Sequence, residues 1–205
     1  WVAVTSKASG YKGVVTVYNR DFESVLTIRL SSRYISDAVV TPDSRGVYLI
    51  SPGQADGAFE NTLLYYTISS REEPTRTISL GSNVVLSIRS AGRCWIIGDE
   101  SLMILDSSGV ITASYDYKDQ YLKMGSLQGD NYAALYLSPS SSGSTGTLVT
   151  VGSDGRAYGE LALDGQTLAM AAQGKTIAVL TTNAIYTTDR NLTSYTTSPN
   201  QRGIR

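Results

Sequence analysis

The chain of 205 residues carries 17 Lys and Arg against 18 Asp and Glu, for a formal net charge of −1, and it contains no histidine and one cysteine. Without histidine, the chain cannot supply a Ser-His-Asp triad, a Cys-His dyad or a zinc site of the usual nitrogen and sulfur type. Because Lys and Arg occur singly along the sequence, it lacks the clustered cations with which proteins follow nucleic-acid phosphates, and we expect no nucleic-acid partner.

The composition is typical of a β-sheet protein. Apolar residues make up 41% of the chain, tyrosine alone accounts for 14 residues, and no long window keeps apolar residues at helical spacing without interruption. Tyrosine and β-branched residues suit a pleated, half-buried surface. We therefore expect an all-β fold with almost no helix, in which the lone Cys94 is a small buried side chain within the apolar run 94–97.

The first 32 residues predict three strands, at residues 1–4, 13–18 and 24–29. These correspond to the second, third and fourth strands of a four-stranded unit whose inner strand is missing. Later units begin with apolar strands near Ile35, Val84, Tyr121 and Thr167. Their spacing is near the roughly 40 to 50 residues of a β-propeller blade.

The clearest unit has strands at residues 84–89, 93–98, 101–106 and 110–115, with a Ser-Gly turn before the last strand. Asp154-Gly155 supplies the matching turn one unit later, because glycine accepts the positive φ that tight hairpins require. This order predicts a β-propeller of the WD40 or quinoprotein type, in preference to a β-sandwich. About five blades are visible, as a single propeller domain or a part of a larger one, over residues 1–32, 33–81, 82–118, 119–164 and 165–198.

Two longer insertions, residues 52–61 and 138–146, join the second strand of a blade to the third, so we expect both to leave the same rim. The second is rich in Gly and Ser, whereas the first offers side chains suited to recognition. Binding residues are accordingly predicted at Asp56, Phe59 and Glu60.

Tyrosines gather at one further place in the sequence. If the strand continues past Asp116, Tyr115 and Tyr117 share a face, and with Tyr121 they would form a stacking platform for a glycan or a peptide. Packing of the same rings between neighbouring blades is the alternative.

No constellation of residues points to catalysis. Asp37 lies near the start of an inner strand, as a glycosidase acid would, but the equivalent places on other inner strands hold Leu86, Met124 and Ala169. Repeated Trp signatures for a quinone cofactor are missing, and residues 106–109 lack the ligands of a calcium loop. We expect no catalytic residue, metal or cofactor. The remaining acids are expected to cap turns: Asp43, Asp106, Asp154, Asp164 and Asp189.

An ordered set of segments resembles a bacterial family known only as a domain of unknown function. The matching segments are residues 11–18, 36–43, 97–99, 114–118 with 121–122, and 185–192. The resemblance implies a single-pass membrane protein with an extracytoplasmic domain like a β-propeller, of which this chain would be a part. It brings no catalytic residues with it.

Two functions are therefore open. One is a non-enzymatic binding or scaffold propeller at the bacterial envelope, displayed from a membrane anchor outside this chain and contacting a protein, peptide or glycan. The other is an extracellular polysaccharide hydrolase or lyase with part of its active site outside this chain. Because end blades expose apolar faces, we also expect either closure through the terminal strands or a homodimer.

Overall fold

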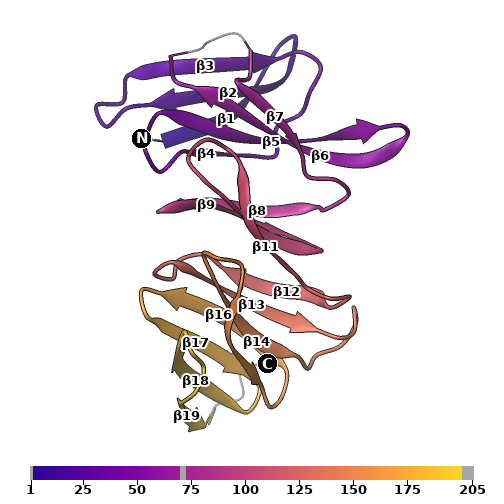
Figure 1. Ribbon diagram of the computed structural model, residues 1–205, viewed down its shortest axis with the longest axis vertical. Helices are drawn as coiled ribbons and strands as arrows, with labels where there is room; N and C mark the ends of the chain where they lie inside the picture. Colours follow the sequence, from indigo (N-terminus) through magenta and orange to yellow (C-terminus); the bar gives the residue numbers. More distant parts are fainter. Residues whose placement is uncertain (1, 70–72, 200–205) are drawn as a thin grey trace. The chain divides into compact units, whose positions relative to one another are not determined.

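A computed structural model describes residues 2–69 and 73–199, and every regular element in these ranges is a β-strand (Figure 1). The strands form five antiparallel sheets, one of three strands and four of four, which confirms the predicted all-β class. Within each sheet the strands lie side by side in chain order. None of these residues forms a helix that could cross a membrane.

The sheets begin close to the predicted inner strands. The first sheet contains β1 (Val2–Ala8), β2 (Tyr11–Tyr18) and β3 (Ser24–Leu30). The second contains β4 (Asp37–Val40), β5 (Gly46–Ala55), β6 (Ala58–Thr67) and β7 (Arg76–Ser79). The third contains β8 (Val85–Ala91), β9 (Arg93–Gly98), β10 (Ser101–Leu105) and β11 (Ile111–Asp116).

The last two sheets lie in the second half of the chain. The fourth contains β12 (Tyr121–Ser126), β13 (Tyr132–Ser138), β14 (Thr147–Gly152) and β15 (Ala157–Ala162). The fifth contains β16 (Thr167–Gln173), β17 (Thr176–Thr181), β18 (Ala184–Asp189) and β19 (Tyr195–Pro199).

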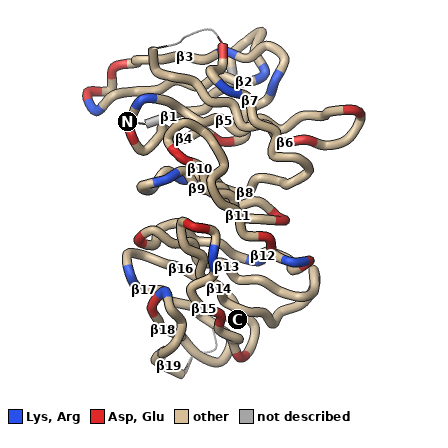
Figure 2. The backbone as a smooth tube through the Cα atoms, viewed as in Figure 1, with Lys and Arg blue, Asp and Glu red and all other residues tan. Residues whose placement is uncertain are grey.

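The chain divides into two compact units, residues 1–98 with 105–111 and residues 99–104 with 112–205. The core of the first unit joins Val15, Val17 and Leu26 of the first sheet to Val47 and Leu49 of the second. In the second unit, the fourth and fifth sheets share a core that includes the following buried side chains: Tyr132, Tyr136, Leu148, Ile177, Val179 and Leu192. Acidic and basic residues are interspersed along the chain (Figure 2).

Alternating burial explains why these segments form strands. In β17, Ile177 and Val179 are buried whereas Thr176 and Ala178 are exposed, because successive side chains point to opposite faces. Central strands such as β13 are buried throughout. Cys94 in β9 is fully buried, as predicted, and burial raises the pKa of its thiol.

Four hairpins share one turn between the last two strands of a sheet. Each turn has five residues, at 19–23, 106–110, 152–156 and 189–193, and the N–H of the fourth residue donates to the carbonyl oxygen of the first over 3.0 to 3.3 Å. The fourth residues have φ between 56° and 81° and are Phe22, Gly109, Gly155 and Leu192. This is the left-handed position of a three-residue hairpin loop, where glycine is the usual occupant.

The segment 52–61 corrects one expectation. It forms no loop but extends the hairpin of β5 and β6, with Pro52 paired to Asn61 and Gln54 to Phe59 around a turn at Asp56-Gly57. The second insertion does form a loop between β13 and β14. There the Ser138 hydroxyl bonds to the backbone of Ser140, and the Tyr136 hydroxyl donates to the carbonyl oxygen of Ser144 at 3.3 Å.

Buried tyrosines differ in how their hydroxyl groups are satisfied. Tyr48 is fully buried and its hydroxyl donates to the carbonyl oxygen of Asp106 at 2.7 Å, which ties the second sheet to the turn before β11. The Tyr132 hydroxyl is also buried but has no hydrogen-bond partner among the described residues. Burial raises the pKa of both phenols, in Tyr132 with a further contribution from Asp130.

We predict that Leu192→Ala lowers the free energy of unfolding by about 2 to 5 kcal/mol, because it opens a cavity in the core of the second unit. Ile185→Ala is the matched control, since Ile185 is 43% exposed on the neighbouring strand, and its cost should stay within about 0.5 kcal/mol. Urea denaturation followed by circular dichroism measures both. If the two substitutions lowered the free energy of unfolding equally, the placement of Leu192 in the core shared by the fourth and fifth sheets would be contradicted.

Removal of a single hydroxyl group should have opposite consequences at the two buried tyrosines. Tyr48→Phe leaves the carbonyl oxygen of Asp106 without its donor and should cost about 0.5 to 1.5 kcal/mol. Tyr132→Phe removes an unpaired buried hydroxyl and should be neutral or stabilising by up to about 1 kcal/mol. Thermal unfolding of both variants, measured side by side, gives the comparison, and a more damaging Tyr132→Phe would count against this assignment.

Alkaline pH should weaken the fold through the buried phenols. Burial holds the pKa of Tyr48 and of Tyr117 above the ordinary value of 10.0, so folding favours their neutral forms. The stability that they contribute is complete below pH 10.0 and falls as the pH rises further. The loss of unfolding free energy above this pH should be smaller in Tyr48→Phe than in the parent chain. An identical pH dependence in urea titrations would refute the contribution of Tyr48.

Candidate functional site

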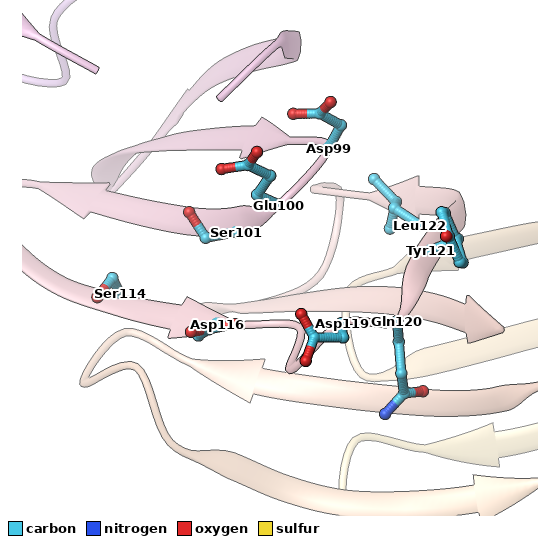
Figure 3. A pocket seen from close by; sticks show the side chains of 9 residues that line it. All are labelled: Asp99, Glu100, Ser101, Ser114, Asp116, Asp119, Gln120, Tyr121 and Leu122. Atoms are coloured by element: carbon cyan, nitrogen blue, oxygen red, sulfur yellow. The ribbon is translucent and has the colours of Figure 1, made fainter. Parts of the chain in front are cut away.

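A pocket with a volume of about 800 Å³ lies within the second unit (Figure 3). One side is the turn between β9 and β10, and the other is the end of β11 with the segment that leads into β12. Its lining residues are Asp99, Glu100, Ser101, Ser114, Asp116, Asp119, Gln120, Tyr121 and Leu122.

Backbone hydrogen bonds hold the two sides of the pocket together. The N–H of Tyr117 donates to the carbonyl oxygen of Glu100 at 3.2 Å, which fixes the segment after β11 against the β9–β10 turn. The N–H of Gln120 donates to the carbonyl oxygen of Tyr117 at 3.1 Å. Between them, Lys118 and Asp119 have φ of 53° and 64°, so the chain reverses through two left-handed residues before β12 begins.

The pocket is acidic. Four of its nine lining residues are carboxylates and none is Lys or Arg. Asp99 and Glu100 project from one side and Asp119 from the other (Figure 3). The carboxylate of Asp116 also accepts a hydrogen bond from the N–H of Lys118 at 2.7 Å. Acidic side chains therefore line both sides of the site.

Tyr121 adds the only aromatic ring among the lining residues, and 49% of it is exposed. It is the first residue of β12, and the left-handed turn before it places it at the pocket. An exposed ring beside carboxylates can receive the charged group of a Lys or Arg side chain on its face.

The predicted platform of three tyrosines is wrong in one member. β11 ends at Asp116, so the strand does not continue through Tyr117, whose ring is 1% exposed. Burial, with the nearby charge of Asp99 as a smaller cause, raises the pKa of Tyr117. Tyr115 is half-buried with its ring centroid 6.3 Å from that of Tyr117. Tyr121 alone reaches the pocket surface.

The other predicted binding residues lie in the first unit. Phe59 and Glu60 are neighbours in β6 and therefore point to opposite faces of the extended hairpin. Phe59 is 43% exposed, whereas the carboxylate of Glu60 accepts a hydrogen bond from the Ser79 hydroxyl. Asp56 is at the tip of the hairpin, with φ of 52°. These three side chains do not form one surface.

The remaining acids serve local structure. The carboxylate of Asp106 accepts from the N–H groups of Ser108 and Val110 at 2.9 and 3.0 Å, and the hydrogen bond from Val110 is the main cause of its lowered pKa. Asp37 accepts from the N–H of Ala38 at 2.8 Å. Asp43, Asp154 and Asp189 cap turns as predicted. Asp164 differs, because it accepts from the side-chain amide of Asn183 at 3.4 Å.

Within residues 2–69 and 73–199, no group of three or more Cys, Asp or Glu side chains is placed to hold a metal ion. Sequence reasoning missed Asp99 and Glu100, because acids in a hairpin turn are usually solvated and nothing local relates them to Asp119, about twenty residues later in the chain.

No protein-family model matches this sequence, and no curated protein matches it either. The fold is similar to solved WD40 domains. That of Pan2 from Neurospora crassa matches with a TM-score of 0.61 at 9% identity, over 97% of this chain and 64% of that one. That of coronin from Toxoplasma gondii matches with a TM-score of 0.60 at 13% identity, over 96% and 56%.

Hsv2 from Kluyveromyces lactis matches with a TM-score of 0.56 at 12% identity, over 91% of this chain and 58% of that one. The chain thus spans 56 to 64% of the length of these three structures. At such low sequence identities, similarity to these structures shows the fold alone. The chain has the WD40-type β-propeller fold.

Proposed function

We propose that this chain is a non-enzymatic binding propeller of the bacterial envelope, displayed outside the cytoplasm from a membrane anchor. The envelope location rests only on the resemblance of segments from residue 11 to residue 192 to a bacterial family of unknown function, and no family model supports it. The binding role rests on the fold. The WD40-type fold is a rigid scaffold on which loops and turns carry recognition.

The acidic pocket is the binding site of this propeller in our proposal, and its ligand is a Lys or Arg side chain of a peptide or protein. The single observation that carries it is that the carboxylates of Asp116 and Asp119 line the pocket beside the exposed ring of Tyr121. A cationic side chain entering there would neutralise this charge. The ring of Tyr121 would contribute a cation–π contact of about 0.5 to 1 kcal/mol at an exposed site.

The expected strength of this contact limits what the pocket can bind alone. Partly exposed ion pairs contribute about 0.2 to 1 kcal/mol each. A free amino acid bound in the millimolar range already requires about 4 kcal/mol. The pocket is therefore expected to recognise a basic side chain as part of a larger peptide contact, with affinity that decreases as salt screens the carboxylates.

To test the proposal, a blocked peptide of alternating Arg and Gly is titrated into the 205-residue chain, and binding is measured from the NMR chemical shifts of the chain. The same peptide with Gln in place of Arg should give no shifts at the pocket. Asp116→Asn with Asp119→Asn should weaken the Arg peptide about fivefold or more, since each removes a charge and each asparagine keeps the backbone conformation. Tyr121→Ala should weaken it about threefold.

Asp154→Asn is the matched control, because Asp154 is an exposed acid in another turn of the second unit and lies 3.9 Å from Arg156. It should leave peptide binding unchanged. Binding of the Gln peptide, or equal losses in the Asp154 variant and the pocket variants, would refute recognition of a basic side chain. Shifts at Phe59 in place of the pocket would move the site to the extended hairpin of β5 and β6.

A further inference from the structure

A second pocket lies within the first unit. Its volume is about 370 Å³, at the lower end of the range for small-molecule sites. One side is the end of β3 with the segment that follows it, residues 29–33. The other side comes from β6, β7 and the residues directly before β7. The pocket is therefore formed where the first sheet faces the second.

The segment that leaves β3 brings two cations to this pocket. Arg29 and Arg33 both line it, with Ser31 and Ser32 between them in the sequence. The segment packs against β2, because a Cβ on Gly13 would lie 3.2 Å from the carbonyl oxygen of Arg33. None of the four lining side chains forms a hydrogen bond or an ion pair with another described residue. Both guanidinium groups are thus available to a ligand.

The hydroxyl of Tyr66 lies at the same pocket. Its ring packs in the core of the unit, and the side chain is 1% exposed. Burial raises the pKa of this phenol, Glu73 raises it further and Arg33 lowers it, so both charged groups lie near the hydroxyl. No described residue forms a hydrogen bond with it. Because buried polar groups are nearly always hydrogen-bonded, an acceptor that enters the pocket would complete this side chain.

The donors around the pocket suit an oxyanion. A guanidinium group can donate two parallel hydrogen bonds to a carboxylate or a phosphate, and the four hydroxyl groups of the lining can each donate one more. A carboxylate offers two oxygens to these donors, whereas a phosphate monoester offers three and carries nearly two negative charges at neutral pH. Glu73 is the one acid among the lining residues, so two arginines leave the lining positive.

We propose that this pocket binds the phosphate group of a small phosphate monoester. Arg29 and Arg33 supply the charge, and the hydroxyl of Tyr66 donates to a phosphate oxygen. Leu30 and Pro74 line the same pocket and would contact the body that carries the phosphate. The site and the acidic pocket share no residue and take ligands of opposite charge, so neither proposal depends on the other.

Phenyl phosphate is the probe and benzoate its matched comparison, because the two share a ring and differ in the anionic group. Each is titrated into the 205-residue chain, and binding is measured from the NMR chemical shifts of the chain. Phenyl phosphate should shift the signals of residues 29–33 and of Thr77 along one saturable curve. Benzoate should bind at least about tenfold more weakly, because it offers fewer acceptor oxygens and less charge.

Three variants separate recognition of the phosphate from packing. Arg29→Gln and Arg33→Gln should each weaken phenyl phosphate about tenfold, because each removes a hydrogen bond to a charged group. Tyr66→Phe should weaken it about threefold, since it removes one hydroxyl and keeps the ring in the core. Thermal unfolding confirms that each variant is folded.

Arg20→Gln is the matched control, because Arg20 is an exposed arginine in the turn before β3. It should leave the affinity for phenyl phosphate unchanged. An equal loss in this variant and in the pocket variants would show attraction to the overall charge and overturn the site. Absence of saturable shifts at residues 29–33 would also overturn the site, and equal affinity for benzoate would overturn the assignment of a phosphate.

Discussion

Steric exclusion at the left-handed position of the hairpin turn is the constraint on which the packing of sheets depends. A residue with a Cβ loses roughly 1 to 2 kcal/mol in that conformation, so glycine is the default. In three of the four turns, at Gly109, Gly155 and Leu192, the same position also contacts the neighbouring sheet. Backbone conformation and inter-sheet packing therefore act on one residue in these turns, and contacts of a buried side chain can offset the strain. Leu192 meets that condition through its place in the core of the second unit.

Much of the fold could be predicted because its turns use residues with a strong local preference. Ser108-Gly109 and Asp154-Gly155 mark hairpins by chemistry that acts within a few residues, and the apolar runs between them alternate in the manner of strands. The same reasoning passed over the turns at Phe22 and Leu192, because neither residue suggests a positive φ. Those turns can be identified only in the structure, from the backbone conformation that the flanking strands impose.

The candidate site was less accessible to sequence reasoning. The grouping of tyrosines and acids around Asp116 did mark the segment that forms one side of the pocket. The opposite side comes from Asp99 and Glu100, which reach it through a backbone hydrogen bond from Tyr117. β11 ends at Asp116, directly before this contact, and the side chain of Tyr117 is buried there. Pairings of this kind are tertiary, and a single sequence does not encode them in a local pattern.

The lone thiol of Cys94 gives the third sheet a built-in reporter. It is fully buried in β9, and burial keeps it protonated well beyond the pH at which a free thiol reacts. An alkylating reagent can then modify it only in molecules where that sheet has opened, since both accessibility and thiolate formation require exposure. The rate of its modification is a direct measure of local opening, and cysteines introduced elsewhere on the surface can be labelled without interference from it.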